Sequence, residues 1–165
     1  MSGTASGNRR ELVVPVDVAA PAEHVWRAVT DWAGQSEWML GTRVEVDGPG
    51  DARGVGGRFR AFTGVGPLGF WDPMEVVEWV EPTPASASGE RRCVVVHHGA
   101  VVRGEGVFEV VELGPDRCRF LWGERIDLPL GVLGRIGWPV GRPLLRAGVA
   151  YSLREMARRC EAEAR

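Results

Sequence analysis

Residues 91–128 contain three consecutive segments in which apolar and polar side chains alternate, and this pattern restricts the fold more than any other feature of the sequence. Alternation with a period of two places one face of each segment in a core and the other face in solvent, which is typical of β-strands. Short turn signals at His98-Gly99 and at residues 114–116 separate the segments. Because such short connections join antiparallel neighbours, the three segments are predicted to pair in one antiparallel sheet.

The register of the second hairpin follows from matching apolar residues with apolar residues across the two strands. A slip of one residue would turn every side chain of a strand to the opposite face, so one pairing suits a buried face. That pairing places Trp122 opposite Phe108, and it places Glu124 opposite Gly106. Glu124 is therefore a carboxylate expected on an otherwise apolar strand face that points to the core.

The first hairpin has a glycine at the second position of its loop, His98-Gly99, which suits a tight two-residue turn. This turn sets His97 opposite Ala100, six residues away from the position opposite Glu124. That separation is about 20 Å at the rise of a β-strand, so the sequence predicts no direct acid–base pair between His97 and Glu124. His97 and His98 are interpreted as turn residues, because adjacent strand residues point to opposite faces and cannot share one metal ion.

Alternation and helical spacing elsewhere predict four more strands and two short helices. Pro21 favours a helix start, and apolar residues at helical spacing continue this helix until Gly34. A second short helix is predicted over residues 36–39. Pro15 places the first strand at a sheet edge or at a bulge, because proline has no hydrogen to donate to a neighbouring strand. The seven predicted strands span residues 12–18, 43–47, 58–62, 70–80, 91–97, 100–113 and 117–128.

The C-terminal segment has the pattern of a long amphipathic helix. Its apolar residues from Leu145 to Cys160 recur at spacings of four, four, three and four, with charged residues between them. This helix is predicted to begin near Arg142, and Pro139 and Pro143 are assigned to its start or to a break before it. Seven antiparallel strands and one long helix form an α+β fold, in which a curved sheet wraps around the helix and both bury their apolar faces.

Composition is that of one compact domain. The 165 residues suffice for a single core, and 44% apolar with 25% charged residues is the usual balance of globular proteins. We expect residues 1–10 to be a disordered tail and residues 11–163 to form the domain. The cysteines Cys93, Cys118 and Cys160 lack the spacing of a disulfide framework or a zinc site, so they are interpreted as buried thiols. No metal and no cofactor are expected.

Charge and hydropathy exclude several classes of partner. The net charge of −2 gives no general attraction to nucleic acid. No apolar run is long enough for integral membrane association, and residues 1–10 lack the apolar centre of a secretory signal, so a cytoplasmic location is expected. All 20 basic residues are arginines that spread over the whole chain, which favours the codon bias of a GC-rich bacterial genome.

Small residues on the predicted core face indicate a cavity. Gly104 and Gly106 leave two side chains out of the inner sheet face, and Gly141 lies in the facing C-terminal region. Their missing bulk is predicted to leave a ligand pocket between the sheet and the last helix. The alternative is that these glycines allow close contact between helix and sheet without any cavity.

Three segments carry a resemblance to a known superfamily: residues 102–110, residues 120–124, and residues 128–131 at the entry to the last helix. With the order of the elements, they resemble the SRPBCC superfamily, the helix-grip fold of START-like domains and birch-pollen-allergen relatives. The nearest branch is the bacterial polyketide cyclase/dehydrase and lipid-transport group, and the resemblance covers residues 11–163. It implies a deep apolar pocket between sheet and helix, where some members bind or carry hydrophobic ligands and others fold or dehydrate polyketide intermediates.

The pattern on the core face yields candidate site residues. A buried carboxyl can act as a general acid or base or accept a hydrogen bond from a ligand hydroxyl, so Glu124 is the catalytic candidate. The alternative is that Glu124 pairs with an arginine or reaches solvent. Large aromatic side chains beside small residues can wall an apolar site. The candidate ligand-binding residues are Gly104, Gly106, Phe108, Trp122, Trp38, Phe62, Trp71, Val102 and Gly141.

Three functions remain open on the sequence. The first hypothesis is a binding protein for a hydrophobic or aromatic small molecule, lipid-like or polyketide-like. The second is a polyketide aromatase/cyclase or dehydratase that uses Glu124. The third is a regulatory or interaction domain without catalysis. The sequence does not specify an oligomeric state.

Overall fold

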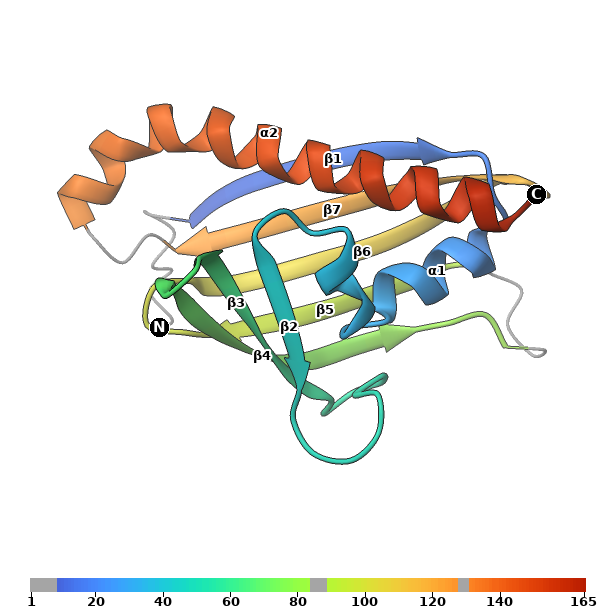
Figure 1. Ribbon diagram of the computed structural model, residues 1–165, viewed down its shortest axis with the longest axis horizontal. Coiled ribbons are helices and arrows are strands. Elements are labelled where there is room, and N and C mark those ends of the chain that lie inside the picture. The colour runs from blue at the N-terminus through green and yellow to red at the C-terminus, as the bar shows by residue number, and fades with distance from the viewer. Residues whose placement is uncertain (1–8, 84–88, 128–130) are drawn as a thin grey trace, which may run out of the picture.

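The computed structural model describes residues 9–83, 89–127 and 131–165, whose arrangement is shown in Figure 1. Seven strands form one antiparallel sheet, and a long C-terminal helix lies along it. The elements in chain order are β1 (Arg9–Val18), α1 (Ala22–Thr30), a 3-10 helix η1 (Gly34–Glu37), β2 (Thr42–Val46), β3 (Arg58–Val65), β4 (Leu68–Val80), β5 (Arg91–His98), β6 (Arg103–Gly114), β7 (Arg117–Asp127) and α2 (Gly131–Glu163).

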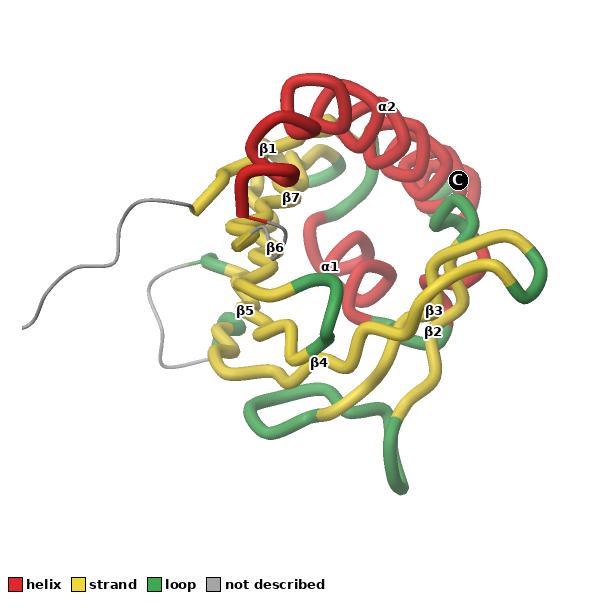
Figure 2. The backbone as a smooth tube through the Cα atoms, turned by 90° about the vertical axis from the view of Figure 1, so that its left-hand side faces the viewer, coloured by secondary structure: helices red, strands yellow, loops and turns green. Residues whose placement is uncertain are grey.

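The sheet has the strand order β1-β7-β6-β5-β4-β3-β2, so β1 and β2 are its two edges. Figure 2 shows that it curls into a half-barrel and that α2 lies across the open side. Pro15 lies in the edge strand β1, as predicted, where a missing hydrogen-bond donor is tolerated. The predicted α+β helix-grip fold with a curved seven-stranded antiparallel sheet is confirmed.

The pairing of β6 with β7 confirms the register predicted from the apolar faces. Phe108 lies opposite Trp122, and Gly106 lies opposite Glu124. Phe108 and Trp122 are both buried, and their ring centroids are 4.8 Å apart. The match of apolar residues therefore determined this register correctly.

The pairing of β5 with β6 differs from the prediction. His98 pairs with Arg103, so the connection comprises residues 99–102 and is not a two-residue turn. His97 consequently lies opposite Gly104 and not opposite Ala100. The difference is a slide of four residues, or about 13 Å along the strand, which keeps each side chain on its predicted face.

Helix α2 begins earlier than predicted. It starts at Gly131 and continues to Glu163, so Pro139 and Pro143 lie inside it and the predicted start near Arg142 is wrong. The two prolines are four residues apart and occupy one side of the helix, where their missing hydrogen bonds bend a helix without ending it. In Figure 1, α2 arches over the sheet.

Smaller differences concern the N-terminal part. Strand β1 begins at Arg9, two residues before the predicted domain boundary at Glu11, and residues 1–8 lie outside the described residues. Helix α1 ends at Thr30, whereas Gly34 begins η1 and does not end α1. The Asp31 carboxylate accepts a hydrogen bond from the Gly34 backbone at 3.1 Å, which makes a local turn between the two helices.

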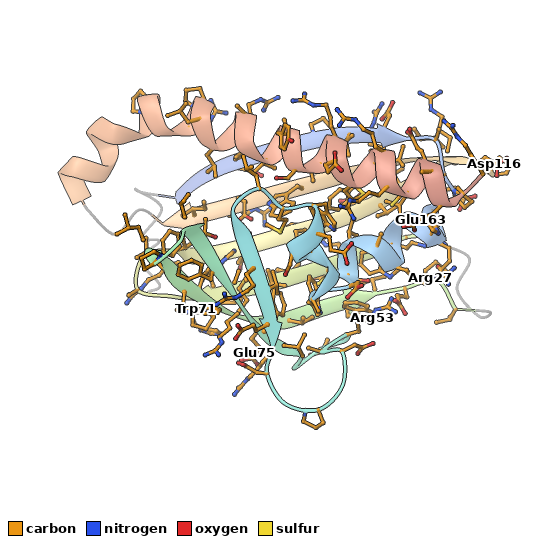
Figure 3. The ribbon with its side chains drawn as sticks, in the orientation of Figure 1. Arg27, Arg53, Trp71, Glu75, Asp116 and Glu163 are labelled. Atoms are coloured by element: carbon orange, nitrogen blue, oxygen red, sulfur yellow. The ribbon has the colours of Figure 1, made fainter. Side chains whose placement is uncertain are left out.

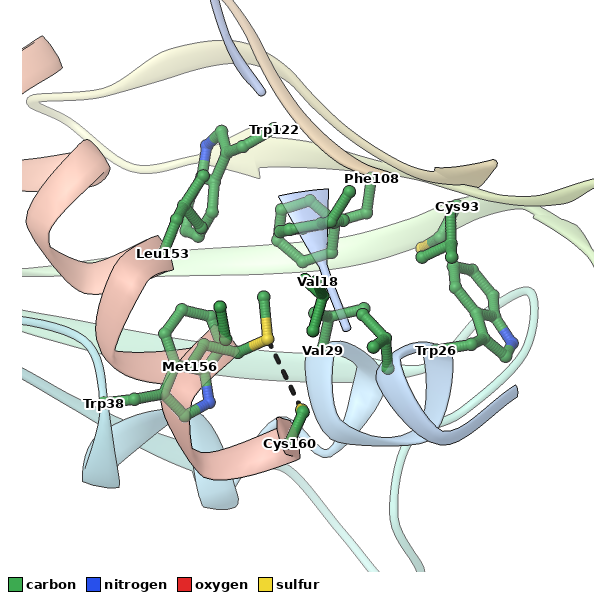
Figure 4. Packing of buried hydrophobic residues seen from close by; sticks show 14 of the residues in the cluster. Val18, Trp26, Val29, Trp38, Cys93, Phe108, Trp122, Leu153, Met156 and Cys160 are labelled. Carbon is green, nitrogen blue, oxygen red and sulfur yellow. Dashed lines mark hydrogen bonds between the residues drawn. The ribbon is translucent and has the colours of Figure 1, made fainter. Parts of the chain in front are cut away.

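The core lies where α1 and the second half of α2 meet the inner sheet face. Figure 4 shows Leu153 and Met156 of α2 near Trp38 and Trp122. Trp26 and Val29 of α1 are fully buried in the same cluster. The three cysteines are free and buried, as predicted, and the sulfur atoms of Cys160 and Met156 are 3.6 Å apart.

Candidate ligand-binding site

A cavity of about 270 Å³ lies between the inner face of the sheet and α2. Strands β3 to β7 supply most of its wall, including the aromatic rings of Phe59, Phe108 and Trp122. Helix α2 supplies the opposite wall with Leu145, Gly148, Val149 and Ser152. The volume is just below the range of ~300–1,000 Å³ that is typical of ligand pockets, so the cavity suits a small ligand.

Gly148 of α2 lines the cavity and, having no side chain, leaves open space beneath the helix. A Cβ atom added to Gly148 would meet no heavy atom within 4 Å. On the sheet side, Ala61 and Thr63 are small residues of β3 that also line the cavity. A glycine on the helix and small side chains on β3 therefore leave space unfilled between the sheet and α2 at this level.

The predicted role of Gly104 and Gly106 is corrected by the structure. Gly104 has a φ of +132°, and an added Cβ would clash with the carbonyl oxygen of Arg125 in β7. Both the backbone conformation and the close approach of β7 therefore require glycine here. A Cβ on Gly106 would lie 2.9 Å from Cγ2 of Val95, 3.3 Å from Nε2 of His97 and 3.6 Å from Oε1 of Glu124. Gly106 thus leaves space for a contact between two polar side chains and does not line the cavity.

Three polar residues meet at one end of the cavity, and we call Asp72, His97 and Glu124 its polar end. They come from β4, β5 and β7, and all three line the cavity. His97 Nδ1 lies 2.6 Å from Asp72 Oδ2, and His97 Nε2 lies 3.3 Å from Glu124 Oε2. The prediction that His97 and Glu124 are about 20 Å apart is therefore wrong, because it rested on the two-residue turn.

The contacts of the polar end fix the orientation of the imidazole ring. The short contact with Asp72 makes His97 Nδ1–H the donor of a charge-assisted hydrogen bond. Trp122 Nε1–H donates to Glu124 Oε1 at 2.6 Å, which anchors the second carboxylate. His97 Nε2 and Glu124 Oε2 are within ion-pair distance, yet their alignment is not that of a hydrogen bond, and both atoms lack another partner. Both atoms remain available to a ligand.

The two carboxylates keep His97 charged. Burial disfavours the imidazolium, but the hydrogen bond from His97 to Asp72, the close contact with Glu124 and the charges of both carboxylates outweigh burial and raise the pKa of His97 to about 10. At neutral pH the ring is therefore protonated on both nitrogens. The imidazolium and two carboxylates give the polar end a net charge of −1.

The stabilising effect of His97 is expected to disappear as the pH rises through about 10. Its pKa rises from 6.5 to about 10 on folding, so its contribution is fully present below pH 6.5 and decreases between these two values. An NMR titration of the imidazole would measure this pKa directly, and Asp72→Asn should lower it because one carboxylate is removed. A midpoint near 6.5 in the wild type would contradict the arrangement.

The structure places four of the sequence-predicted site residues on the cavity wall. Phe108, Trp122, Val102 and Glu124 all line it. Trp38 does not line the cavity, although it is buried and its ring meets the edge of Trp122 at 6.3 Å between centroids. Trp38 therefore packs against the Trp122 ring of the aromatic wall without lining the cavity itself.

Three other candidates lie away from the cavity. Phe62 and Trp71 pair across β3 and β4 on the outer sheet face, with the guanidinium of Arg43 over both rings. Figure 3 shows Trp71 on the side of the molecule away from α2. Gly141 is exposed on α2, upstream of Leu145 at the cavity. The residues of β3 that line the cavity are Phe59, Ala61 and Thr63. Because side chains alternate along a strand, Phe62 points to the outer face.

Two residues of the site were missed in the sequence. His97 was interpreted as a turn residue because of the wrong loop length, and Asp72 was not singled out. Asp72 alternates with Phe70 and Met74 on the inner face of β4, which is the same kind of signal that identified Glu124. Over the described ranges, no group of three or more histidine, cysteine or acidic side chains has an arrangement that could hold a metal ion.

No helix within the described ranges is both long and apolar enough to cross a membrane. The model of a family described as polyketide cyclase/dehydrase and lipid transport matches residues 9–161. No curated protein matches the sequence.

Solved structures share this fold at low sequence identity. The Zhui aromatase/cyclase from Streptomyces sp. R1128 has a TM-score of 0.72 at 17% identity, over 95% of this chain and 96% of that one. A START superfamily protein from Mycobacterium smegmatis has a TM-score of 0.62 at 19% identity, over 93% and 96%. Norcoclaurine synthase from Thalictrum flavum has a TM-score of 0.58 at 18% identity, over 94% and 99%. At these identities the likeness concerns the fold.

Proposed function

The chain belongs to the polyketide cyclase/dehydrase and lipid transport family, and on this premise we propose that it binds a hydrophobic or aromatic small molecule, lipid-like or polyketide-like. The observation that carries the proposal is the cavity of about 270 Å³ between the sheet and α2. At ~30 Å³ per water molecule this volume equals about nine waters, so the cavity suits a small ligand.

The composition of the wall supports an apolar ligand body. Phe59, Phe108 and Trp122 offer ring faces and edges, and Met74 and Val149 add flexible or branched apolar surface. Burying the apolar area of a ligand against such a wall is favourable by about 25 cal/mol per Å². The polar end then supplies the few hydrogen-bonding groups that orient a ligand in an otherwise apolar pocket.

A ligand in this cavity is expected to raise the melting temperature. At a concentration about 100-fold above its Kd, a ligand adds about 2.7 kcal/mol to the free energy of unfolding, which for a chain of this size is a shift of about 5 °C or more. Differential scanning calorimetry with a set of aromatic and lipid-like compounds measures the shift, and native mass spectrometry detects a ligand that co-purifies. A bare native mass together with no shift from any compound would contradict the proposal.

A second candidate function is a cyclase or dehydratase acting on a polyketide-like substrate. The observation that favours it is the pairing of a proton donor, His97 Nε2, with a carboxylate acceptor, Glu124 Oε2, at 3.3 Å in the same cavity. Acid–base catalysis needs both groups within reach of one substrate. Glu124→Gln keeps the shape and removes the base, so undiminished turnover of a polyketide substrate by this variant would exclude the role.

A further inference from the structure

The polar end holds three buried atoms whose hydrogen-bonding capacity is unused, Asp72 Oδ1, His97 Nε2 and Glu124 Oε2, and the last two are 3.3 Å apart. His97 Nε2 and Glu124 Oε2 have no hydrogen-bond partner among the described residues, and the exposed fractions of their side chains are 8% and 11%. A buried polar atom without a partner costs about 1–3 kcal/mol. Both atoms belong to side chains that line the cavity, so a ligand there can remove this cost.

The two atoms require opposite hydrogen-bonding roles from a ligand. Nδ1 of His97 is committed to Asp72, and the protonated ring presents Nε2–H as a donor. Glu124 Oε2 is an acceptor, since Oε1 already receives the Trp122 indole hydrogen. The atoms are 3.3 Å apart, so one ligand oxygen can reach both. A hydroxyl oxygen accepts from Nε2–H and donates its hydrogen to Oε2, whereas a carbonyl or carboxylate oxygen has no hydrogen to donate.

Charge disfavours an anionic ligand group at the same place, and hydrogen-bonding geometry disfavours a cationic one. The polar end carries a net charge of −1, and no arginine is among the described residues that line the cavity. A ligand carboxylate would lie unpaired beside Glu124, which is costly in a buried site. A ligand ammonium would direct its hydrogens at the Nε2–H of His97 and has no lone pair to accept from it.

We propose that the ligand of this protein carries a neutral hydroxyl group, phenolic or alcoholic, whose oxygen bridges His97 Nε2 and Glu124 Oε2. The inference rests on the proposed function and narrows it to the chemistry of one ligand group. Free fatty acids and other carboxylates are then poor ligands, although their apolar parts suit the cavity. Gly106 leaves room beside this contact, because an added Cβ would lie 3.3 Å from Nε2 of His97 and 3.6 Å from Oε1 of Glu124.

Four naphthalenes with the same ring system test the inference: 2-naphthol, 2-naphthoate, 2-naphthylmethylammonium and 2-methylnaphthalene. Titration calorimetry at pH 7 is expected to show that the neutral 2-naphthol binds at least about tenfold more tightly than each of the others. Equal or tighter binding of the naphthoate or of the ammonium compound would overturn the inference. Binding of all four with equal affinity would support the proposed function but would contradict the requirement for a hydroxyl group. Binding of none would contradict both.

Two matched variants test whether Glu124 causes the preference for the hydroxyl compound. Glu124→Gln removes the negative charge and the pure acceptor, so the preference for 2-naphthol over 2-naphthoate should fall several-fold. Glu75→Gln is the control, since Glu75 is on β4 but bonds Arg58 outside the cavity, and Figure 3 shows it away from α2. An unchanged preference in Glu124→Gln would overturn the inference. The comparison of the four compounds needs only the wild-type protein, so it stands if a variant fails to fold.

Discussion

Replacing His97 with leucine is expected to lower the free energy of unfolding by about 3–5 kcal/mol at pH 7, which is the usual cost of removing one partner from a buried ion pair. The imidazolium lies between the Asp72 and Glu124 carboxylates, and the exposed fraction of its side chain is 8%. Leucine fills a similar volume but leaves two buried carboxylates without the positive charge between them. The loss therefore comes from uncompensated charge more than from packing.

Urea unfolding of the wild type and of the variant measures this effect. His98→Leu is the matched control in the next residue, because the exposed fraction of the His98 side chain is 54% and its nearest acid, Glu75, is 3.7 Å away. The control should change stability by about 0.5 kcal/mol or less, as exposed substitutions usually do. Similar small effects for both variants would contradict the buried charge cluster.

Gly148→Leu is expected to weaken ligand binding by about 100-fold, which corresponds to about 2.8 kcal/mol. Gly148 lines the cavity, and an added Cβ would meet no heavy atom within 4 Å, so a leucine side chain occupies space that a ligand needs. Leucine also has a helix propensity more favourable than that of glycine by about 0.5–1 kcal/mol, so the variant should fold at least as well as the wild type. Loss of binding without loss of stability separates a blocked cavity from a damaged fold.

Gly141→Leu provides the control on the same helix. An added Cβ on Gly141 also meets nothing within 4 Å, but this residue is exposed and does not line the cavity. Calorimetric titration with 2-naphthol should give the wild-type Kd for Gly141→Leu and a much weaker one for Gly148→Leu. If Gly148→Leu binds as tightly as the control, the ligand does not occupy the space beneath α2.

The fold and the inward position of Glu124 could be predicted from the sequence because both depend on the parity of side chains. Pairing apolar with apolar residues determined the β6–β7 register, in which Glu124 faces Gly106 and Trp122 faces Phe108. That register alone identified a carboxylate on an apolar inner face. Parity is a local property, so a single sequence carries it.

The position of His97 relative to Glu124 depended on the length of the loop between β5 and β6, which parity does not determine. A two-residue and a four-residue connection between β5 and β6 put the same side chains on the inner face, but they slide His97 by about 13 Å relative to Glu124. The glycine at position 99 suited the tight turn, whereas in the structure an added Cβ there would lie 2.9 Å from Oδ1 of Asp72. This glycine therefore accommodates a tertiary contact, which local turn preference does not include.

The missing side chains of Gly104 and Gly106 predicted a cavity, but in the structure neither glycine lines it. Gly104 and Gly106 leave room for backbone and for the contact between His97 and Glu124, while Gly148 leaves the space beneath α2. A sequence reveals that bulk is missing at a position but not which neighbour would have occupied the space. The same limit applies to Phe62 and Trp71, whose rings pack on the outer sheet face.

A crystal structure of the wild-type protein with 2-naphthol tests directly whether the cavity holds a ligand whose hydroxyl bridges His97 and Glu124. We expect electron density for the ring between Phe108, Trp122 and α2, with the hydroxyl oxygen at about 2.6–3.2 Å from both His97 Nε2 and Glu124 Oε2. Density for the compound on the outer sheet face with the cavity unoccupied, or a ring in the cavity with its oxygen turned away from His97 and Glu124, would contradict this expectation.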